Sequence, residues 1–159
     1  MSKNLEVGES VPDFELPEAS TDTIRLSDVY SSHTTVLAFY QSDVGMMCTV
    51  EFMKLTEMYP QFKDLGVQIL GISTNSMFTH AGWKSRIMIP FPLLADFDAS
   101  VTELYGVLEG DIGYLEGRSK RAIFVINKEG ILVYKWVTDN PALEPDYDKI
   151  LTVCKNMSD

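Results

Sequence analysis

Cysteine is scarce in this chain, and its scarcity limits the chemistry that the protein can perform. The 159 residues include two cysteines, Cys48 and Cys154, which lie far apart in the sequence. They form neither a disulfide framework nor a Cys-x-x-Cys pair, so a thiol–disulfide oxidoreductase built on that motif is disfavoured. Neither histidine, His33 or His80, has a metal-ligand spacing to a cysteine, so the sequence predicts no metal site.

Positive charge and long apolar runs are also in short supply. Lysine and arginine number 13 against 23 acidic residues, which gives a net charge of −10, and no basic cluster is present. Phosphate binding needs a positive face, so no nucleic-acid partner is expected. No run approaches the length of a transmembrane helix, and no apolar segment follows a basic start at the N-terminus. We therefore expect no membrane span, no signal peptide and a cytoplasmic location.

What the chain does contain is typical of a globular protein. Hydrophobic residues make up 45% of the sequence, and neither internal repeats nor a linker divide it. A chain of this length suits one domain with an ample core, so a single domain is predicted over residues 1–159.

Apolar runs alternate with helical patterns along the chain. Residues 14–16 and 23–26 predict an N-terminal β-hairpin, and Ser27 and Asp28 predict the cap of a short helical turn that ends at Tyr30. Further strands are expected near residues 35–40, 67–72, 92–96, 121–126 and 131–137, with helices ending near residue 63 and over residues 77–89, 100–105 and 146–157. Strands separated by helices become parallel neighbours, and the late hairpin adds antiparallel strands. The prediction is an α/β fold with a mixed sheet of about five strands, flanked by helices.

Cys48 lies where a buried strand is followed by a helix, which makes it the candidate nucleophile. Ser42, Asp43 and Gly45 form a turn between the two elements, and Cys48 follows in or near the first helical turn. Free backbone N–H groups and the positive end of the helix dipole favour a thiolate at such a position. The alternative is an ordinary buried cysteine that only packs.

Short motifs follow one another in a recognisable order at residues 7–8, 12–14, 39–40, 48–52, 70–73, 83–84, 91–96, 105–107, 121–126 and at Gly130. This order resembles that of the peroxiredoxins, which are thiol peroxidases with a thioredoxin-like fold, and the resemblance covers nearly the whole chain. Because no second cysteine lies five residues after Cys48, the chain is most similar to the one-cysteine members of the AhpE group.

The resemblance implies a set of site residues and two departures from the family's pattern. The peroxidatic cysteine falls on Cys48, the strand arginine on Arg121, and the glutamate that orients this arginine on Glu51. Without the resemblance, Arg121 is an ordinary surface charge and Glu51 a favourable acid near a helix start. Gln41 stands where the family has proline, and Gly45 where it has threonine or serine.

Gly45 is the more serious departure, because the family's hydroxyl at this position bonds both the thiolate and the peroxide. Loss of such a charge-assisted hydrogen bond costs roughly 1.5–3 kcal/mol, or about one to two orders of magnitude in rate. The resemblance implies a peroxidase that reduces hydrogen peroxide or organic hydroperoxides through a sulfenic acid, with no metal or organic cofactor. The departures at Gln41 and Gly45 favour the alternative, a redox sensor or binding protein with a weakened site.

Gln41, Gly45, Met47 and Trp83 are expected around a substrate pocket. Trp83 is also a natural packing residue, and the alternatives for Met47 are core packing and a subunit contact. Cys154 either packs on the apolar side of the last helix or resolves the sulfenic acid. If it packs, an external thiol or a thioredoxin-like reductant must regenerate the enzyme. The resemblance also implies a homodimer or a higher homo-oligomer.

Overall fold

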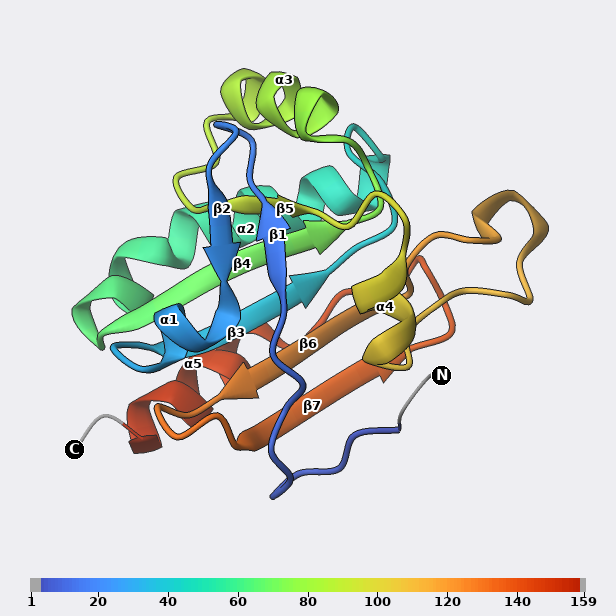
Figure 1. The fold of residues 1–159 in the computed structure, drawn as a ribbon. Helices are drawn as coiled ribbons and strands as arrows, with labels where there is room; N and C mark the ends of the chain where they lie inside the picture. The colour runs from blue at the N-terminus through green and yellow to red at the C-terminus, as the bar shows by residue number, and fades with distance from the viewer. Residues whose placement is uncertain (1–3, 158–159) are drawn as a thin grey trace.

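Five strands form a central mixed sheet in the order β5-β4-β3-β6-β7 (Figure 1). Strand β3 pairs in parallel with β4 and antiparallel with β6. The pairs β4–β5 and β6–β7 are parallel and antiparallel, respectively. The strands are β3 (Thr34–Phe39), β4 (Val67–Ser73), β5 (Leu93–Ala95), β6 (Arg121–Ile126) and β7 (Leu132–Thr138). The predicted mixed α/β sheet is confirmed.

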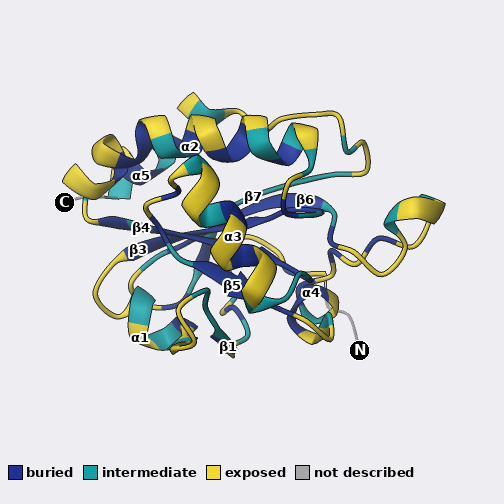
Figure 2. Cartoon of the chain, turned by 90° about the horizontal axis from the view of Figure 1, so that it is seen from above, coloured by how far each residue is buried: buried dark blue, intermediate teal, exposed yellow. Residues whose placement is uncertain are grey.

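Helices and a hairpin cover the two faces of this sheet. Helices α2 (Met46–Asp64) and α5 (Tyr147–Met157) lie on one face, as the view from above shows (Figure 2). The N-terminal hairpin lies across the other face together with two short helices (Figure 1). These elements are β1 (Glu15–Pro17), β2 (Thr23–Arg25), α1 (Leu26–Tyr30) and α4 (Ser100–Leu104). Helix α3 (Met77–Ile87) packs beside β5 at the edge of the sheet.

The structure is a computed structural model that describes residues 4–157. The two ends of the domain expected over residues 1–159 lie outside the described residues, as do the first three residues considered for a signal peptide. Within the described part, no helix is both long enough and apolar enough to span a membrane.

The periodic apolar residues of α2 fix how this helix lies on the sheet. Phe52, Leu55 and Phe62 are fully buried on the side that faces the strands, as their spacing predicts. Gly71 in β4 allows the close approach, because a Cβ atom there would lie 2.7 Å from the Phe52 ring and 2.7 Å from Leu93. The packing holds the first turn of α2, and with it Cys48, against the end of β3.

Two helix boundaries differ by more than one residue from the sequence prediction. Helix α1 begins at Leu26 rather than after a Ser27–Asp28 cap, because the distant Asp13 accepts hydrogen bonds from both the backbone N–H and the hydroxyl of Ser27. Helix α3 ends at Ile87, two residues before the predicted end. Met88 turns into the left-handed region with φ of 57°, and the N–H of Ile89 bonds to the carbonyl of Lys84.

Candidate active site

Cys48 is the third residue of α2, in the first turn that follows the loop from β3. Gly45 is the N-cap residue and supplies no side-chain hydrogen bond to this turn. The first N–H groups of a helix lack intrahelical acceptors, and they give its N-terminus a partial positive charge. The Cys48 side chain is buried, with 3% of the residue exposed. The location between strand and helix agrees with the prediction from sequence.

Arg121 reaches the sulfur from the first position of β6. Because β6 pairs with β3, this position lies beside the end of the strand that leads to the Cys48 loop. The Nη1 atom is 3.6 Å from the Cys48 Sγ and donates to Glu51 Oε1 at 2.7 Å. Nη2 donates to the carbonyl oxygen of Pro141 at 2.9 Å. The sequence-predicted trio of Cys48, Glu51 and Arg121 is therefore brought together.

The Glu51–Arg121 ion pair is almost completely enclosed. Glu51 is 0% exposed and Arg121 is 1% exposed. Burial raises the pKa of Glu51 to about 7, because the attraction of Arg121 offsets only part of the lost hydration. Burial lowers the pKa of Arg121, but the negative charges of Glu51 and Cys48 raise it by more, so the net pKa shift is upward. Arg121 thus stays a cation beside the sulfur.

Gln41 supplies the second polar contact of the sulfur. The Cys48 thiol donates to Gln41 Oε1 over 3.4 Å, and Gln41 is itself buried. Gly45 also lies next to the sulfur, because a Cβ atom at this position would be 3.5 Å from the Cys48 Sγ. Both residues that depart from the expected pattern therefore lie directly against the sulfur.

A pocket of about 300 Å³ opens onto these groups. Met47, Gln41 and Gly45, which the sequence predicts around a substrate pocket, line it together with Cys48 and Arg121. The remaining lining residues are Ser42, Met46, Tyr114, Leu115, Pro141 and Ala142. A larger hollow of about 560 Å³ is lined by Thr34 and Asn127, at the opposite end of the sheet, and contains no cysteine. The smaller pocket is the one that combines space for a small substrate with a nucleophile and a cation.

Comparison with known proteins identifies the family of this chain. The model of the AhpC/TSA family matches residues 7–135. The chain belongs to the AhpC/TSA family. Peroxiredoxin-2 of Mus musculus is 35% identical over 150 residues, which cover 88% of this chain and 73% of that protein.

Solved structures of peroxiredoxins share the fold. Peroxidoxin BcpB from Mycobacterium tuberculosis matches with a TM-score of 0.88 and 27% identity, over 98% of this chain and 100% of that one. The reduced 2-Cys peroxiredoxin of Plasmodium vivax matches with a TM-score of 0.83 and 27% identity, over 94% of this chain and 80% of that one. The thioredoxin-like architecture predicted from the sequence is confirmed.

Two candidate residues of this peroxiredoxin lie away from the pocket. Trp83 does not line it; the indole is 3% exposed and packs 5.4 Å from the rings of both Tyr40 and Phe52. Cys154 is 1% exposed on the inner side of α5, in the apolar layer between the helices and the sheet. Burial raises the pKa of the Cys154 thiol to about 12. Both side chains belong to the same buried apolar cluster.

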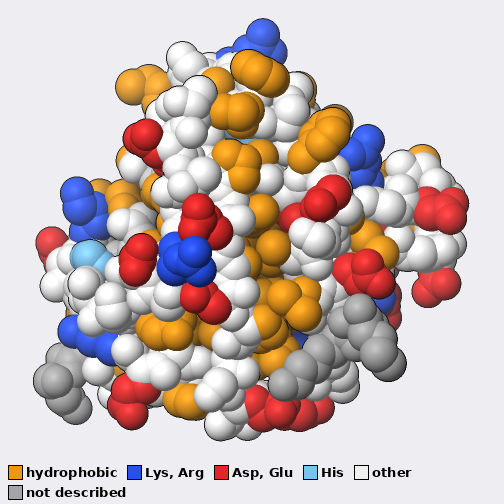
Figure 3. Space-filling model, viewed as in Figure 1, with side chains coloured by type: hydrophobic (Ala, Val, Ile, Leu, Met, Phe, Trp, Pro, Cys, Tyr) orange, Lys and Arg blue, Asp and Glu red, His pale blue; other side chains and the backbone are white. Residues whose placement is uncertain are grey.

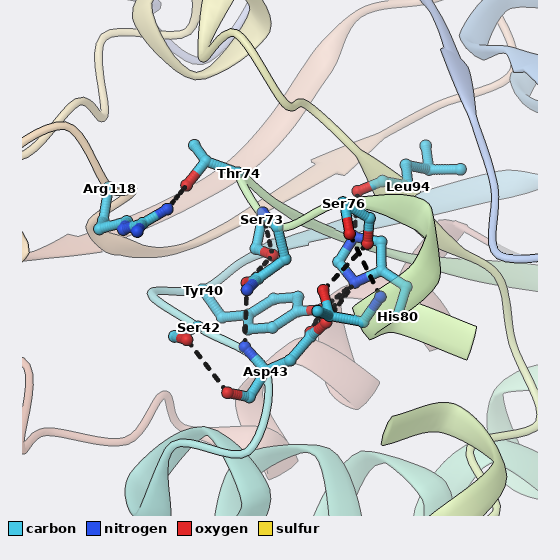
Figure 4. A network of polar contacts seen from close by, with 11 residues as sticks. Tyr40, Ser42, Asp43, Ser73, Thr74, Ser76, His80, Leu94 and Arg118 are labelled. Atoms are coloured by element: carbon cyan, nitrogen blue, oxygen red, sulfur yellow. Dashed lines mark hydrogen bonds and ion pairs between the residues drawn. The ribbon is translucent and has the colours of Figure 1, made fainter. Parts of the chain in front are cut away.

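A buried polar network anchors the loop that precedes Cys48 (Figure 4). The Tyr40 hydroxyl donates to Asp43 Oδ1 at 2.6 Å, and His80 Nδ1 lies 2.8 Å from Asp43 Oδ2. His80 Nε2 donates to the carbonyl oxygen of Leu94 at 2.9 Å, which can only accept. From the other side, Asn75 Oδ1 accepts from the backbone N–H of Asp43 at 3.0 Å.

The geometry of this network sets the protonation of its members. His80 Nε2 must carry a hydrogen for Leu94, so the proton between Nδ1 and Asp43 belongs either to an imidazolium or to the carboxyl group. Burial, together with the charge of Asp43, raises the pKa of Tyr40 well above its ordinary value, and its hydroxyl keeps the proton that it donates. His80 is thus a core residue with a hydrogen-bond partner at both ring nitrogens.

Sequence reasoning missed several groups of the site, for a physical reason. Pro141 acts through its backbone carbonyl, which every residue possesses, so its identity gives no signal. The sequence places Asp43 only in a turn, and no periodicity links it to a histidine 37 residues later. Tyr114 and Leu115 belong to the short 3-10 helix η1 (Gly113–Leu115) in a segment expected to be loop. The buried carboxylate of Glu109 orders the start of this segment, because its Oε2 accepts hydrogen bonds from the backbone N–H groups of residues 110–112.

Proposed function

We propose that this member of the AhpC/TSA family is a thiol-dependent peroxidase in which Cys48 attacks hydrogen peroxide or an organic hydroperoxide. The observation that carries the proposal is the contact of the Cys48 sulfur with Arg121, 3.6 Å away and held as a cation by Glu51. The family membership and the small pocket around these atoms support it.

In the proposed reaction, the Cys48 thiolate attacks the terminal oxygen of the hydroperoxide. An S–O bond forms as the O–O bond breaks, so the sulfur is oxidised to a sulfenic acid by two electrons. The departing oxygen takes a proton and leaves as water or an alcohol. Arg121 favours the thiolate and stabilises the negative charge that develops on the departing oxygen. The N–H groups of the first turn of α2 are available to the peroxide oxygens.

Glu51 and Pro141 act on this reaction by orienting Arg121. Together they occupy both terminal nitrogens of the guanidinium, which leaves Nη1 directed at the sulfur as well as at Glu51. A planar guanidinium suits this arrangement, because its donors lie in a rigid fork. We assign Glu51 as a positioning residue of the proposed site.

In the proposed cycle, a thiol from outside the chain reduces the Cys48 sulfenic acid back to the thiol. One external thiol condenses with the sulfenic acid to form a mixed disulfide and water, and a second thiol releases Cys48 and carries away the disulfide. Cys154 is proposed as a packing residue, which makes the protein a one-cysteine enzyme of the AhpE kind with an external, thioredoxin-like reductant. Two buried free cysteines fit a reducing compartment, and we propose a cytoplasmic location.

A homodimer or a higher homo-oligomer is the proposed assembly. Large apolar side chains are exposed on the described surface, among them Phe78 and Met88 near the ends of α3 and Tyr114 beside the pocket. Figure 3 shows hydrophobic side chains gathered over the upper part of one face, around α3. Exposed apolar surface of this kind favours contact with a second copy. Light scattering after size exclusion measures the assembly directly.

The rival function, a redox sensor or binding protein with a weakened site, rests on Gly45 and Gln41. It is not favoured, because the cysteine, arginine and glutamate of a working site are present and in contact. Both functions use an oxidisable Cys48, but only the peroxidase requires fast oxidation.

The deciding experiment is a stopped-flow reaction of the reduced protein with hydrogen peroxide. Tryptophan fluorescence and a sulfenic-acid trap read by mass report the oxidation, and Cys48→Ser is the control. We expect oxidation at least about tenfold faster than that of the same protein unfolded in urea, and none at this site in the Cys48→Ser variant. A rate equal to that of the unfolded chain would contradict the peroxidase and favour the sensor.

A further inference from the structure

Gly45 leaves one side of the Cys48 sulfur without a side-chain hydrogen-bond donor. Its backbone angles, φ of −59° and ψ of 141°, suit any residue, so the conformation does not require glycine. A Cβ atom at this position would be 3.5 Å from the Cys48 Sγ and 3.2 Å from the carbonyl oxygen of Ser42. A side-chain hydroxyl at this position would lie close to the sulfur, but glycine has no side chain to carry one.

The side chain of Gln41 reaches the sulfur from the other end of the loop between β3 and α2. Its Oε1 is 3.4 Å from the Cys48 Sγ, and the residue is 6% exposed. Among residues 4–157, the contact with Cys48 is the one hydrogen bond of this carboxamide. The amide is therefore buried beside the nucleophile without being committed to a structural partner.

A carboxamide can serve both protonation states of the sulfur. Its carbonyl oxygen accepts from the thiol, and its NH₂ group can donate to the thiolate. The terminal torsion of glutamine is broad and roughly two-fold, so a half turn exchanges the two atoms. Proline at this position has neither group, and a threonine hydroxyl at position 45 would donate in a similar way.

From this geometry we infer that Gln41 is a catalytic residue, whose amide Nε2 donates to the Cys48 thiolate in place of the hydroxyl that Gly45 lacks. The inference rests on the proposed peroxidase function and deepens it. The amide stabilises the thiolate before attack, while Arg121 stabilises the negative charge that develops on the departing oxygen. The sulfur is oxidised and the peroxide reduced as above, and the amide gains or loses no proton.

The test compares variants of matched shape in the full-length protein. Gln41→Met keeps the length and much of the volume of the side chain and removes the hydrogen bond. Gln61→Met makes the same change at an exposed position of α2 and serves as the control. Gly45→Thr, added to Gln41→Met, places a hydroxyl next to the sulfur again. Circular dichroism and thermal unfolding establish that each variant folds.

Two rates are measured for each variant: alkylation of Cys48 by iodoacetamide at pH 7, which reports the thiolate, and oxidation by hydrogen peroxide in stopped flow. We expect Gln41→Met to lower both by about tenfold or more, because a charge-assisted hydrogen bond is lost. Gln61→Met should stay within about twofold of the wild type. Gly45→Thr in the Gln41→Met background should recover most of both rates.

Retention of both rates by folded Gln41→Met would overturn the inference, because packing alone would then explain the glutamine. A loss that Gly45→Thr does not reverse would overturn it too, since the methionine would then have disturbed the pocket. Failure of the peroxidase function itself is recognised separately, by slow peroxide oxidation of the wild type. The alkylation rates still decide the role of Gln41 in that case, because they do not depend on peroxide.

Discussion

The Arg121 guanidinium is held by three groups from different parts of the chain. Glu51 in α2, Cys48 one turn earlier and the carbonyl of Pro141 after β7 each contact one of its terminal nitrogens. A lysine ammonium is a single point charge on a flexible stem and cannot satisfy separated acceptors in this fork geometry. The identity of this cation, as well as its charge, therefore matters for the site.

Arg121→Lys tests this requirement. We expect the peroxide oxidation of Cys48 to fall by roughly one to two orders of magnitude, because the charge can no longer be held both at Glu51 and at the sulfur. Arg25→Lys, on the exposed hairpin strand β2, is the matched control and should leave the rate unchanged. Equal rates for Arg121→Lys and the wild type would show that a positive charge alone is sufficient.

Cys154 is the residue for which burial and reactivity conflict. A resolving cysteine attacks as a thiolate, whereas burial raises the pKa of this thiol to about 12 and keeps it neutral near pH 7. We expect Cys154→Ala to retain peroxide oxidation and thiol-dependent turnover within about twofold. Its free energy of unfolding should fall by about 1 kcal/mol through the loss of buried volume. A disulfide between Cys48 and Cys154 in the oxidised wild type, detected by mass spectrometry, would contradict the assignment of Cys154 as a packing residue.

At the scale of elements, the loop between β3 and α2 is fixed by contacts distant in sequence. Asp43 binds Tyr40 and His80 through its side chain and Asn75 through its backbone. The next residue, Val44, has φ of 67°, a left-handed conformation that is rare for a β-branched side chain. Such strain persists where neighbouring contacts determine the backbone, as the anchored Asp43 does here.

Two variants of Asp43 test whether its hydrogen bonds or its negative charge anchor the loop. Asp43→Ala leaves His80 and Tyr40 without their buried partner, and we expect the free energy of unfolding to fall by about 3 kcal/mol. Asp43→Asn should cost less than half of this, because an amide can accept from Tyr40 and donate to Nδ1 of a neutral imidazole. Urea denaturation measures both, with the exposed Asp22→Ala as the control. Equal losses for alanine and asparagine would mean that the charge of Asp43 is essential to the anchor.

The elements themselves were largely predictable, whereas their junctions were not. Helical spacing indicates the buried side of α2 at Phe52, Leu55 and Phe62, and continuous apolar runs indicate the central strands. The end of α3 was missed because Met88 takes the left-handed position that glycine usually signals. For the site, the strand–helix junction indicated Cys48, but only the resemblance to peroxiredoxins indicated Arg121 and Glu51. The contact of Gln41 with the sulfur depends on how the loop folds back, which no local pattern encodes.

At the scale of the whole molecule, the buried Glu51 couples the site to global stability. Burial raises its pKa from 4.5 to about 7, so the folded protein binds this proton more tightly than the unfolded chain does. An acid with a raised pKa in the folded state contributes stability at low pH, and this contribution is lost as the pH rises from about 4.5 to about 7. The full effect is on the order of 3 kcal/mol. An ionised, functional site therefore has a cost in folding free energy.

Glu51→Gln removes this titration while keeping the shape of the side chain. We expect the free energy of unfolding of the wild type, measured relative to the variant by urea denaturation, to decline between pH 4.5 and pH 7 and to level off above that range. Groups that do not interact with Glu51 contribute equally to both proteins and cancel in the difference. Parallel stability curves over this range would show that Glu51 ionises at its ordinary pKa. The Arg121 charge would then fully compensate the burial of the carboxylate, and the site would be assembled without a cost to the fold.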